Sequence, residues 1–173
     1  MLNLGLEAKF DVVSAARTLQ WVSDPGLAVS GMARLTKSEG LVVVLDYNHS
    51  QNRWEPQAPA KFLVFYAAFL KWRAQNGWDN DMGDHLPAMF GAAGLVEVGS
   101  QEADQVAERG FVGFGEKVEL WPRVIDNIGQ KLIEAERIDE DQLQSAKISF
   151  EEFSKNTLKT QVLAMKSVIG RKA

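Results

Sequence analysis

The chain has 173 residues, of which 46% are hydrophobic and 24% charged, as in a globular domain with one core. Its formal net charge of −4 argues against binding to duplex nucleic acid, because such binding depends on Lys and Arg at the phosphates. It has no cysteine and two histidines, which excludes disulfides, thiolate nucleophiles, Cys-ligated zinc and a histidine-rich metal site. No apolar run has the length of a membrane span or the pattern of a signal peptide, so we expect a cytoplasmic protein without a membrane partner.

The first part of the chain predicts a strand, a helix and a second strand. Residues 10–16 are mostly apolar and short, which is typical of a strand. Asp24-Pro25 indicates a helix start, because Asp caps free N–H groups and Pro suits the first helical position. After a turn at 38–40, residues 41–45 are apolar on both faces and rich in valine, as in a central parallel strand covered by helices on both sides. Together these elements predict a βαβ unit.

The middle of the chain predicts a loop, two helices and a third strand. Residues 48–59 are polar and contain two prolines, so they are expected to form a loop. Aromatic residues then recur at helical spacing, at Phe62, Phe65, Phe69 and Trp72. Asp84 is expected to cap a short helix that ends at Gly94, because glycine readily adopts the left-handed conformation of a helix end. A third strand is expected near 95–102.

The last third predicts more helices and a final strand. Apolar residues at helical spacing indicate a long amphipathic helix over 118–135, starting or bending at Pro122. Two capping-box patterns follow, Asp139 with Gln142 and Ser149 with Glu152. The apolar segment near 160–169 predicts the last strand.

Several short segments follow one another in a characteristic order: Phe10-Asp11-Val12-Val13, Leu19-Gln20-Trp21, Asp24-Pro25, Met32-Ala33-Arg34-Leu35, Gly40 and the Val-rich strand, then Phe69-Leu70, Trp72-Arg73, Gly77, Asp79, Asp81, Gly83 and Ala93-Gly94-Leu95. This order resembles the second half of class I S-adenosylmethionine-dependent methyltransferases, and its later part is similar to their ubiquinone-biosynthesis-like, small-molecule branch. The resemblance implies an α/β fold: a partial Rossmann-like sheet of about four strands with several flanking helices. The last strand is expected to run antiparallel beside the 41–46 strand.

The resemblance also implies which parts of the family's domain are present. We expect a single domain over 1–173, the C-terminal half of a methyltransferase domain, with helical lid or substrate-side insertions at 55–93 and 113–157. In the family, a glycine-rich turn after the first strand and an acid after the second hold the cofactor, and neither precedes Phe10. Gly110, Gly113 and Gly115 follow no convincing apolar strand and are not expected to replace the turn. S-adenosylmethionine is therefore the cofactor of the intact family, but we expect this chain alone to bind it weakly or not at all.

Candidate cofactor residues follow the first strand, because ligands of open α/β sheets bind outside the carboxyl ends of the strands. By resemblance, this segment lines the methionine part of the cofactor, through Ser14, Ala15, Ala16, Arg17, Gln20 and Trp21. Arg17 either faces the cofactor's carboxylate or makes a surface pair. Trp21 either walls the pocket or belongs to the core.

Candidate catalytic and substrate residues follow the second strand. His49 is the candidate base, and a solvated loop histidine is the alternative. Substrate contacts are expected from Asp46, Tyr47 and Asn48, and from the aromatic helix through Phe65, Phe69 and Trp72, which otherwise form core. The acidic segment with Asp79, Asp81, Asp84 and His85 lacks EF-hand spacing, so we interpret it as a capped helix start in a solvated loop and expect no metal.

Two functions remain open at this point. The chain is either a fragment of a small-molecule methyltransferase, inactive by itself, or a methyltransferase-like remnant that self-associates as an interaction module. An unrelated helical binding protein would require the match over 10–49 to be accidental. A homodimer is expected because the strand at 10–16 would have one unpaired apolar edge, and such edges pair with other chains.

Overall fold

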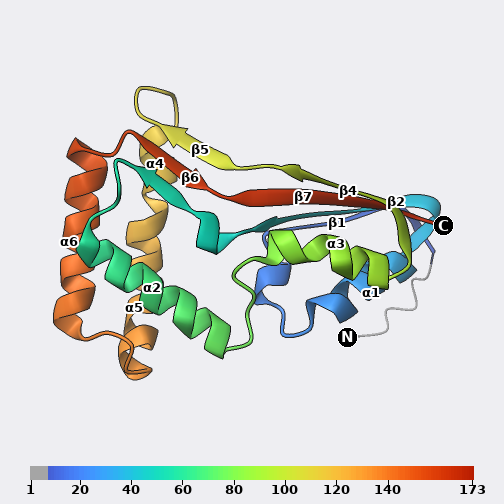
Figure 1. Cartoon of the computed structure of the whole chain (residues 1–173), viewed down its shortest axis with the longest axis horizontal. Helices are drawn as coiled ribbons and strands as arrows, with labels where there is room; N and C mark the ends of the chain where they lie inside the picture. The colour runs from blue at the N-terminus through green and yellow to red at the C-terminus, as the bar shows by residue number, and fades with distance from the viewer. Residues whose placement is uncertain (1–7) are drawn as a thin grey trace. The chain divides into compact units, whose positions relative to one another are not determined.

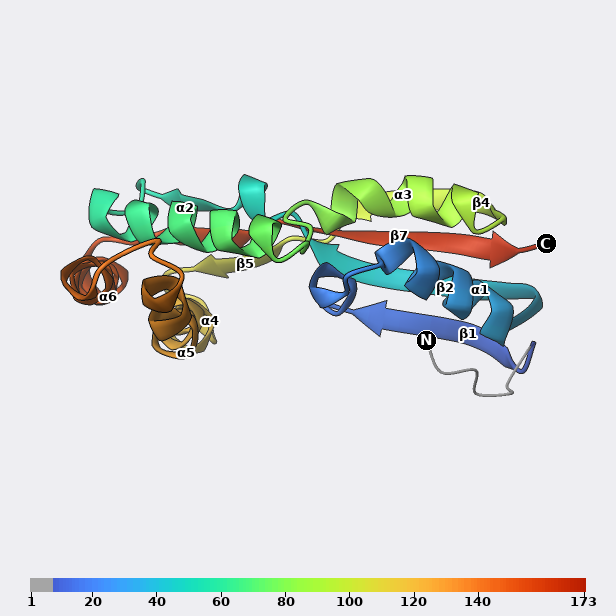
Figure 2. The same cartoon turned by 90° about the horizontal axis from the view of Figure 1, so that it is seen from below.

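The computed structural model describes residues 8–173, which form two compact units that we describe separately (Figures 1 and 2). Unit 1 consists of the chain up to Ser50, of Gly77–Asp104 and of Ala164–Ala173. Unit 2 consists of Gln51–Asn76 and Gln105–Leu163. Residues 77–93, which the sequence pattern assigned to an insertion, are part of unit 1. Whether unit 2 serves as a lid stays a prediction.

Unit 1 is built on a four-stranded mixed sheet in the order β1-β2-β7-β4. β1 (Phe10–Ala16) runs parallel to β2 (Thr36–Tyr47). β7 (Met165–Lys172) runs antiparallel to β2 on one side and to β4 (Leu95–Glu102) on the other. The predicted α/β sheet, with an antiparallel last strand beside the second strand, is confirmed.

The expected turn at 38–40 is wrong, because these residues lie inside β2. They form an irregularity in the strand, where the register with β1 shifts between Phe10 and Val12 and Glu39 has φ of 65°. Gly40 is required at this point, since a Cβ there would lie 2.9 Å from the backbone oxygen of Asp11. The strand therefore continues through a bulge that the glycine permits.

Two helices cover one face of the sheet in unit 1. α1 (Pro25–Leu35) starts as predicted, with Asp24 Oδ1 accepting a 2.8 Å hydrogen bond from the Leu27 N–H. α3 (Met82–Ala92) contacts α1 and three strands, and Figure 1 shows both helices on the same side of the sheet. They enclose a core of Leu19, Val29, Ala33, Val42, Val44, Met82, Leu86, Phe90, Leu95 and Val168. On the opposite face, Leu41 and Ile169 are each 37% exposed, so the expected cover of β2 on both faces is wrong among the described residues.

The two ends of α3 test two of the expectations. Asp84 is not its cap, because the helix starts at Met82 and Asp84 lies in the first turn. Gly94 follows the helix with φ of 77°, and its N–H donates to the Gly91 oxygen at 3.0 Å. The left-handed glycine at the helix end is confirmed.

Unit 2 contains a three-stranded antiparallel sheet in which β6 (Thr160–Leu163) lies between β3 (Arg53–Glu55) and β5 (Gln105–Glu108). β3 falls in the segment expected to be a loop, which also holds the 3-10 turn His49–Gln51. The predicted single strand near 160–169 is two strands, separated at Ala164, with β6 in unit 2 and β7 in unit 1.

A strand does precede the glycines at 110, 113 and 115, contrary to expectation, because β5 ends at Glu108. This strand belongs to an antiparallel sheet, and the following helix, α4 (Phe114–Val118), has five residues. The dinucleotide-type turn joins a parallel strand to a long helix. The glycines therefore do not form a cofactor turn of that type.

The longer helices of unit 2 are α2 (Ala60–Gln75), α5 (Leu120–Glu134) and α6 (Glu140–Asn156). α2 and α5 match the predicted helices, with Pro122 in the first turn of α5. The capping box of Asp139 and Gln142 is confirmed, with hydrogen bonds of 2.7 and 3.0 Å. The second capping box is wrong, because Ser149 lies inside α6 and its hydroxyl donates to the Ala146 oxygen.

The core of unit 2 is mostly aromatic. Side chains from β3 and three helices pack edge-on or tilted against one another: Trp54, Phe62, Tyr66, Phe69, Trp121 and Phe150. Arg73 is completely buried beside them, with its guanidinium carbon 5.5 Å from the ring centre of Phe69. Among residues 8–173, no helix combines the length and the apolar character needed to cross a bilayer.

Candidate functional site

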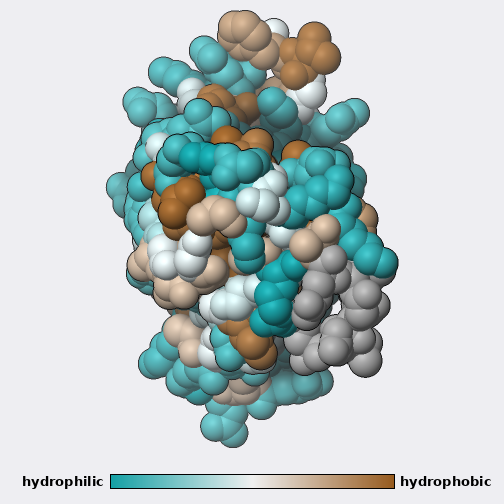
Figure 3. Space-filling view, turned by 90° about the vertical axis from the view of Figure 1, so that its right-hand side faces the viewer, coloured by the Kyte–Doolittle hydropathy of each residue, from teal (hydrophilic) through white to brown (hydrophobic). Residues whose placement is uncertain are grey.

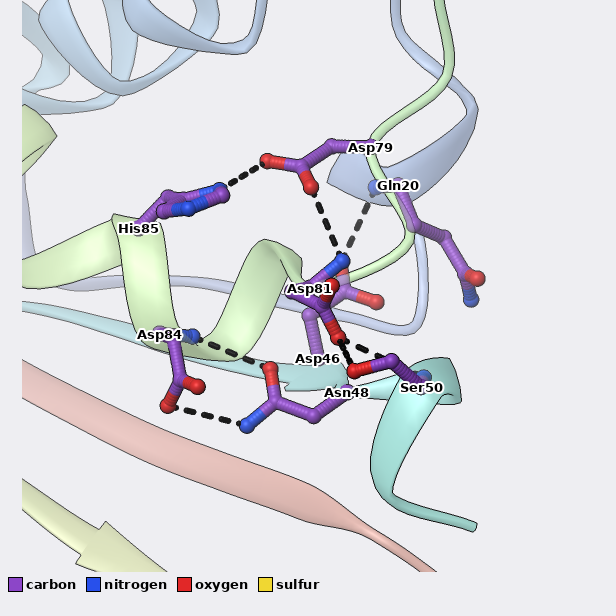
Figure 4. A network of polar contacts seen from close by, with 8 residues as sticks. All are labelled: Gln20, Asp46, Asn48, Ser50, Asp79, Asp81, Asp84 and His85. Atoms are coloured by element: carbon purple, nitrogen blue, oxygen red, sulfur yellow. Dashed lines mark hydrogen bonds and ion pairs between the residues drawn. The ribbon is translucent and has the colours of Figure 1, made fainter. Parts of the chain in front are cut away.

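The carboxyl ends of β1 and β2 lie at the same edge of the sheet in unit 1, because the two strands are parallel. A 3-10 turn follows each strand, Leu19–Trp21 after β1 and His49–Gln51 after β2. Arg17 turns the chain with φ of 57°, and its N–H donates to the Leu45 oxygen at 2.8 Å. Polar side chains from both strand ends and from the start of α3 meet there (Figure 4).

Asp46 joins the two strand ends. Its side chain is 0% exposed, and its Oδ2 accepts a 3.2 Å hydrogen bond from the backbone N–H of Gln20. Its Oδ1 accepts a second bond, of 2.9 Å, from the N–H of Tyr47. A buried carboxylate needs such donors to offset the cost of leaving water. Asp46 therefore fixes the turn after β1 against the end of β2.

His49 is held by the same turn. Its Nε2 lies 2.6 Å from Oε1 of Gln20, a side chain that is 2% exposed. Because an amide oxygen only accepts, this pairing requires a proton on Nε2. The ring stacks on Tyr47 at 4.9 Å between centres and is 7% exposed. His49 is thus a positioned, buried histidine and not a solvated loop residue.

Arg17 and Tyr47 form the outer part of this site. The guanidinium carbon of Arg17 is 5.8 Å from the ring centre of Tyr47. Burial raises the pKa of Tyr47 above its ordinary value of 10.0, and the positive charge of Arg17 acts in the opposite direction. Arg17 itself is exposed, so the edge of the site carries a cation that an anionic ligand can reach.

Asn48 connects the end of β2 to α3. Its Nδ2 donates to Asp84 Oδ1, and its Oδ1 accepts from the Asp84 N–H, both at 3.0 Å (Figure 4). Lys166 of β7 lies 2.6 Å from the same Asp84 oxygen. Gly83 allows this close approach, because a Cβ there would lie 2.8 Å from Asn48 Oδ1. Three segments that are distant in sequence are thereby fixed together.

The acidic segment before α3 is ordered by hydrogen bonds of its own (Figure 4). The Ser50 hydroxyl donates to Asp81, and Asp79 accepts the N–H of Asp81 at 2.8 Å. Asp79 also lies 2.6 Å from Nδ1 of His85, and this hydrogen bond raises the pKa of His85. In the described part of the chain, no three His, Asp or Glu side chains are grouped to hold a metal ion.

Comparisons with known proteins agree with this architecture. A family model described as a methyltransferase domain matches residues 1–44. The YcgJ protein of Bacillus subtilis is similar in structure, with a TM-score of 0.52 and 15% identity, over 99% of this chain and 67% of YcgJ. The chain carries the class I methyltransferase fold. No curated protein matches its sequence.

Two other solved structures have lower TM-scores. A candidate methyltransferase of Bacillus halodurans C-125 gives 0.49, with 13% identity over 99% of this chain and 73% of its own. Phosphoethanolamine N-methyltransferase 2 of Haemonchus contortus, solved with phosphomonomethylethanolamine and S-adenosylhomocysteine, gives 0.48, with 11% identity over 96% of this chain. The match spans 34% of the Haemonchus enzyme.

Within this methyltransferase fold, the predicted cofactor residues lie in two environments. Arg17, Gln20 and Trp21 lie at the strand ends, where Trp21 is 43% exposed and meets the ring of Trp78 edge-on at 5.1 Å. Inside β1, Ser14 and Ala16 are exposed, whereas Ala15 packs against the core of unit 1. Their contacts with a cofactor stay predictions.

The predicted substrate residues belong to both units. Asp46, Tyr47 and Asn48 gather at the end of β2, whereas Phe65, Phe69 and Trp72 lie on α2 in unit 2. Phe65 and Phe69 are 1% and 3% exposed. Sequence reasoning missed the partners of Asn48, which are Asp84 and, through it, Lys166. No sequence signal marks them, because their roles arise from contacts between distant segments.

Proposed function

We propose that this chain takes part in methyl transfer from S-adenosylmethionine to a small molecule, as the part of a methyltransferase that carries the ends of β1 and β2. The observation that supports this most directly is the convergence of Gln20, Asp46 and His49 at one edge of a parallel strand pair. Open α/β sheets bind their ligands at this edge. The family model over residues 1–44 supports the same function.

The exposed residues at this edge fit parts of the cofactor. S-adenosylmethionine has an amino-acid carboxylate and an adenine ring. The exposed guanidinium of Arg17 fits the carboxylate, and the exposed face of Trp21 fits an aromatic or apolar part. Asp46 does not fit the role of a ribose ligand, because it is fully buried and already accepts two backbone N–H groups. These residues form one wall, so we expect weak binding by this chain alone.

His49 is the candidate base of the proposed reaction. The cofactor supplies a methyl group on a positively charged sulfur, so transfer depends mainly on an aligned attack. A base is needed only where the acceptor must lose a proton. Gln20 directs a proton of the His49 ring to Nε2, so proton acceptance falls to Nδ1, an atom that is buried in this structure. Gln20 is in this respect a positioning residue for His49.

Nuclear magnetic resonance with S-adenosylhomocysteine tests this proposal on the chain as it stands. At millimolar ligand we expect shifts of the Trp21 indole and His49 ring signals and no shift of Trp54 in unit 2. Arg17→Ala should weaken the response, whereas Arg34→Ala, at an exposed arginine in the last turn of α1, should not. An absent response, or one confined to unit 2, would contradict the proposed site. Micromolar affinity by calorimetry would contradict the single-wall interpretation.

The alternative function, a self-associating module, is favoured by the side of β1 that pairs with no strand among residues 8–173. β1 is the terminal strand of the described sheet, and its Phe10 and Val12 are 43% and 55% exposed. We propose that two copies pair along this edge. Light scattering should then give a dimer at micromolar concentration, and Val12→Lys should convert it to a monomer. Val98→Lys, on the other terminal strand, is the matched control. A monomeric wild type would exclude this dimer.

A further inference from the structure

Asp79 and His85 form a carboxylate–imidazole pair at the start of α3. Nδ1 of His85 lies 2.6 Å from Oδ2 of Asp79, whose other oxygen accepts the N–H of Asp81 at 2.8 Å. Figure 4 shows the side chains of Asp79 and His85 pointing toward each other. Because a carboxylate only accepts, the pairing places a proton on Nδ1 of His85. The neutral ring then presents its lone pair at Nε2, so Asp79 fixes both the orientation and the tautomer of the ring.

The two histidines of the chain differ in what a ligand can reach. The side chain of His85 is 59% exposed, and its Nδ1 is turned to Asp79, so Nε2 is the nitrogen that a ligand can meet. His49 is 7% exposed, its Nε2 faces Gln20 and its Nδ1 is buried. A proton acceptor has to come within hydrogen-bond reach of the proton that it takes. The geometry therefore favours His85 over His49 for this role.

The segment that carries the pair is fastened to both turns at the strand ends. Trp78, next to Asp79 in the chain, meets the ring of Trp21 edge-on at 5.1 Å in the turn after β1. In the turn after β2, the backbone N–H of His49 donates to the Asn80 oxygen at 2.6 Å. The pair of Asp79 and His85 is thereby attached to the edge at which open α/β sheets bind their ligands.

The opposite end of the sheet in unit 1, where β1 and β2 begin, carries charges that compensate one another. Arg171 pairs with both Glu39 and Glu97, and Lys37 pairs with Asp11 at 2.9 Å. Figure 3 views the molecule from this end, where hydrophilic side chains predominate. Histidine is the side chain that takes up a proton near neutral pH, and both histidines of the chain lie at the other end of β1 and β2.

We propose that His85, oriented by Asp79, accepts the proton that the methyl acceptor loses, an inference that rests on the proposed methyltransferase function. The lone pair of an acceptor nitrogen or oxygen bonds to the methyl carbon, and the C–S bond breaks with its electron pair on sulfur. The proton of the acceptor passes to Nε2 of His85, and the Asp79 carboxylate stabilises the imidazolium that forms. The acceptor is accordingly a molecule with an N–H or O–H group at the methylated atom.

The charges around His85 suit a proton acceptor. The hydrogen bond to Asp79 raises the pKa of His85 above 6.5, and partial burial acts in the opposite direction. The negative charges of Asp79, Asp81 and Asp84 raise the pKa further. A more basic ring takes up a proton more readily, and the same carboxylates favour the imidazolium over the neutral ring.

Magnetic resonance titration of both histidine rings tests the proposal on the full chain, with S-adenosylmethionine and S-adenosylhomocysteine as probes at equal millimolar concentration. Only the first probe carries a positive charge on sulfur. A cation about 6 Å from the ring lowers the pKa of a histidine by about 0.5 even at the dielectric constant of water, because it disfavours the imidazolium. We therefore expect the pKa of His85, extrapolated to saturation, to be lower by about 0.5 or more with S-adenosylmethionine than with S-adenosylhomocysteine.

The possible results separate this inference from the proposed function. If the Trp21 signals respond to both probes while the pKa of His85 is the same with each, the role of His85 is overturned and the proposed function stands. A difference confined to His49 overturns the inference in favour of His49. If neither Trp21 nor His85 responds to either probe, the proposed function fails, and this inference fails with it.

Two further measurements examine the pair itself. Diethyl pyrocarbonate modifies neutral imidazoles, and mass spectrometry reads the modification at each histidine. We expect His85 to react several-fold faster than His49, and equal rates would overturn the argument from exposure. Asp79→Asn should lower the pKa of His85 toward 6.5. Asp126→Asn, at an exposed carboxylate that pairs with Lys147 in unit 2, is the matched control and should leave that pKa unchanged.

Discussion

Replacing Gly83 by alanine should destabilise unit 1, whereas the same change at Gly91 of the same helix should stabilise it. Alanine is favoured over glycine in a helix by about 1 kcal/mol, and a Cβ at Gly91 meets no atom within 4 Å. At Gly83 the Cβ would lie 2.8 Å from Asn48 Oδ1, 3.1 Å from the Asp46 backbone oxygen and 3.2 Å from the Lys166 Cβ. Asn48 can retreat only by giving up its hydrogen bonds to Asp84, at about 1–3 kcal/mol for each buried group left unpaired.

Urea unfolding followed by circular dichroism measures both variants. We expect Gly91→Ala to gain up to about 1 kcal/mol and Gly83→Ala to lose roughly 1–3 kcal/mol, so that the two differ by about 2–4 kcal/mol. The comparison cancels the helix preference of alanine and isolates the contact between α3 and the end of β2. If Gly83→Ala is as stable as Gly91→Ala, the close packing of Asn48 against α3 does not exist in solution.

Two other predictions concern the polar network. Asp46→Ala should lower the free energy of unfolding by roughly 2–5 kcal/mol in urea titrations, because two backbone N–H groups lose their acceptor. The control Asp11→Ala removes an exposed ion pair and should change the free energy of unfolding by less than about 1 kcal/mol. The hydrogen bond to Asp79 raises the pKa of His85 above 6.5, so its stabilising effect is present below pH 6.5 and is lost as the pH rises through the folded-state pKa. Magnetic resonance titration of His85 should show this raised pKa, and an Asp79→Asn variant with an unchanged His85 pKa would refute the contact.

Local sequence signals predicted the elements that depend on nearby residues. The cap of α1 at Asp24 depends on a side chain three residues from the N–H that it accepts. The valines at 42 and 44 face the covered side of the sheet, but the sequence does not single them out, because residues 41–45 are apolar at every position. The place of β7 beside β2 was predicted only through the family resemblance, because pairing with a strand near the end of the chain leaves no local trace, and the place of β4 beside β7 was not predicted.

The errors in the strands of unit 2 fall where distant contacts decide the structure. β3 and β5 are short strands that are paired only because β6 lies between them. The apolar run near 160–169 is continuous in sequence, yet it divides at Ala164 between two sheets. Nearby, Asp104 Oδ1 accepts the N–H of Met165 at 3.0 Å, which gives the first residue of β7 a side-chain partner. Periodicity cannot indicate such a break, because both halves have the same apolar pattern.

The site separates residues whose burial suits a structural role from those that a ligand can reach. Asp46 and Asn48 have no exposed surface, and their hydrogen bonds hold the end of β2 to the turn after β1 and to α3. Arg17 and Trp21 are exposed at the same edge. Because loss of a buried group unfolds its surroundings while loss of an exposed group mainly removes a contact, substitutions at Arg17 and Trp21 report on ligand binding. The proposed cofactor contact is therefore tested at Arg17 and Trp21, whereas the buried Asp46 and Asn48 set the frame that positions them.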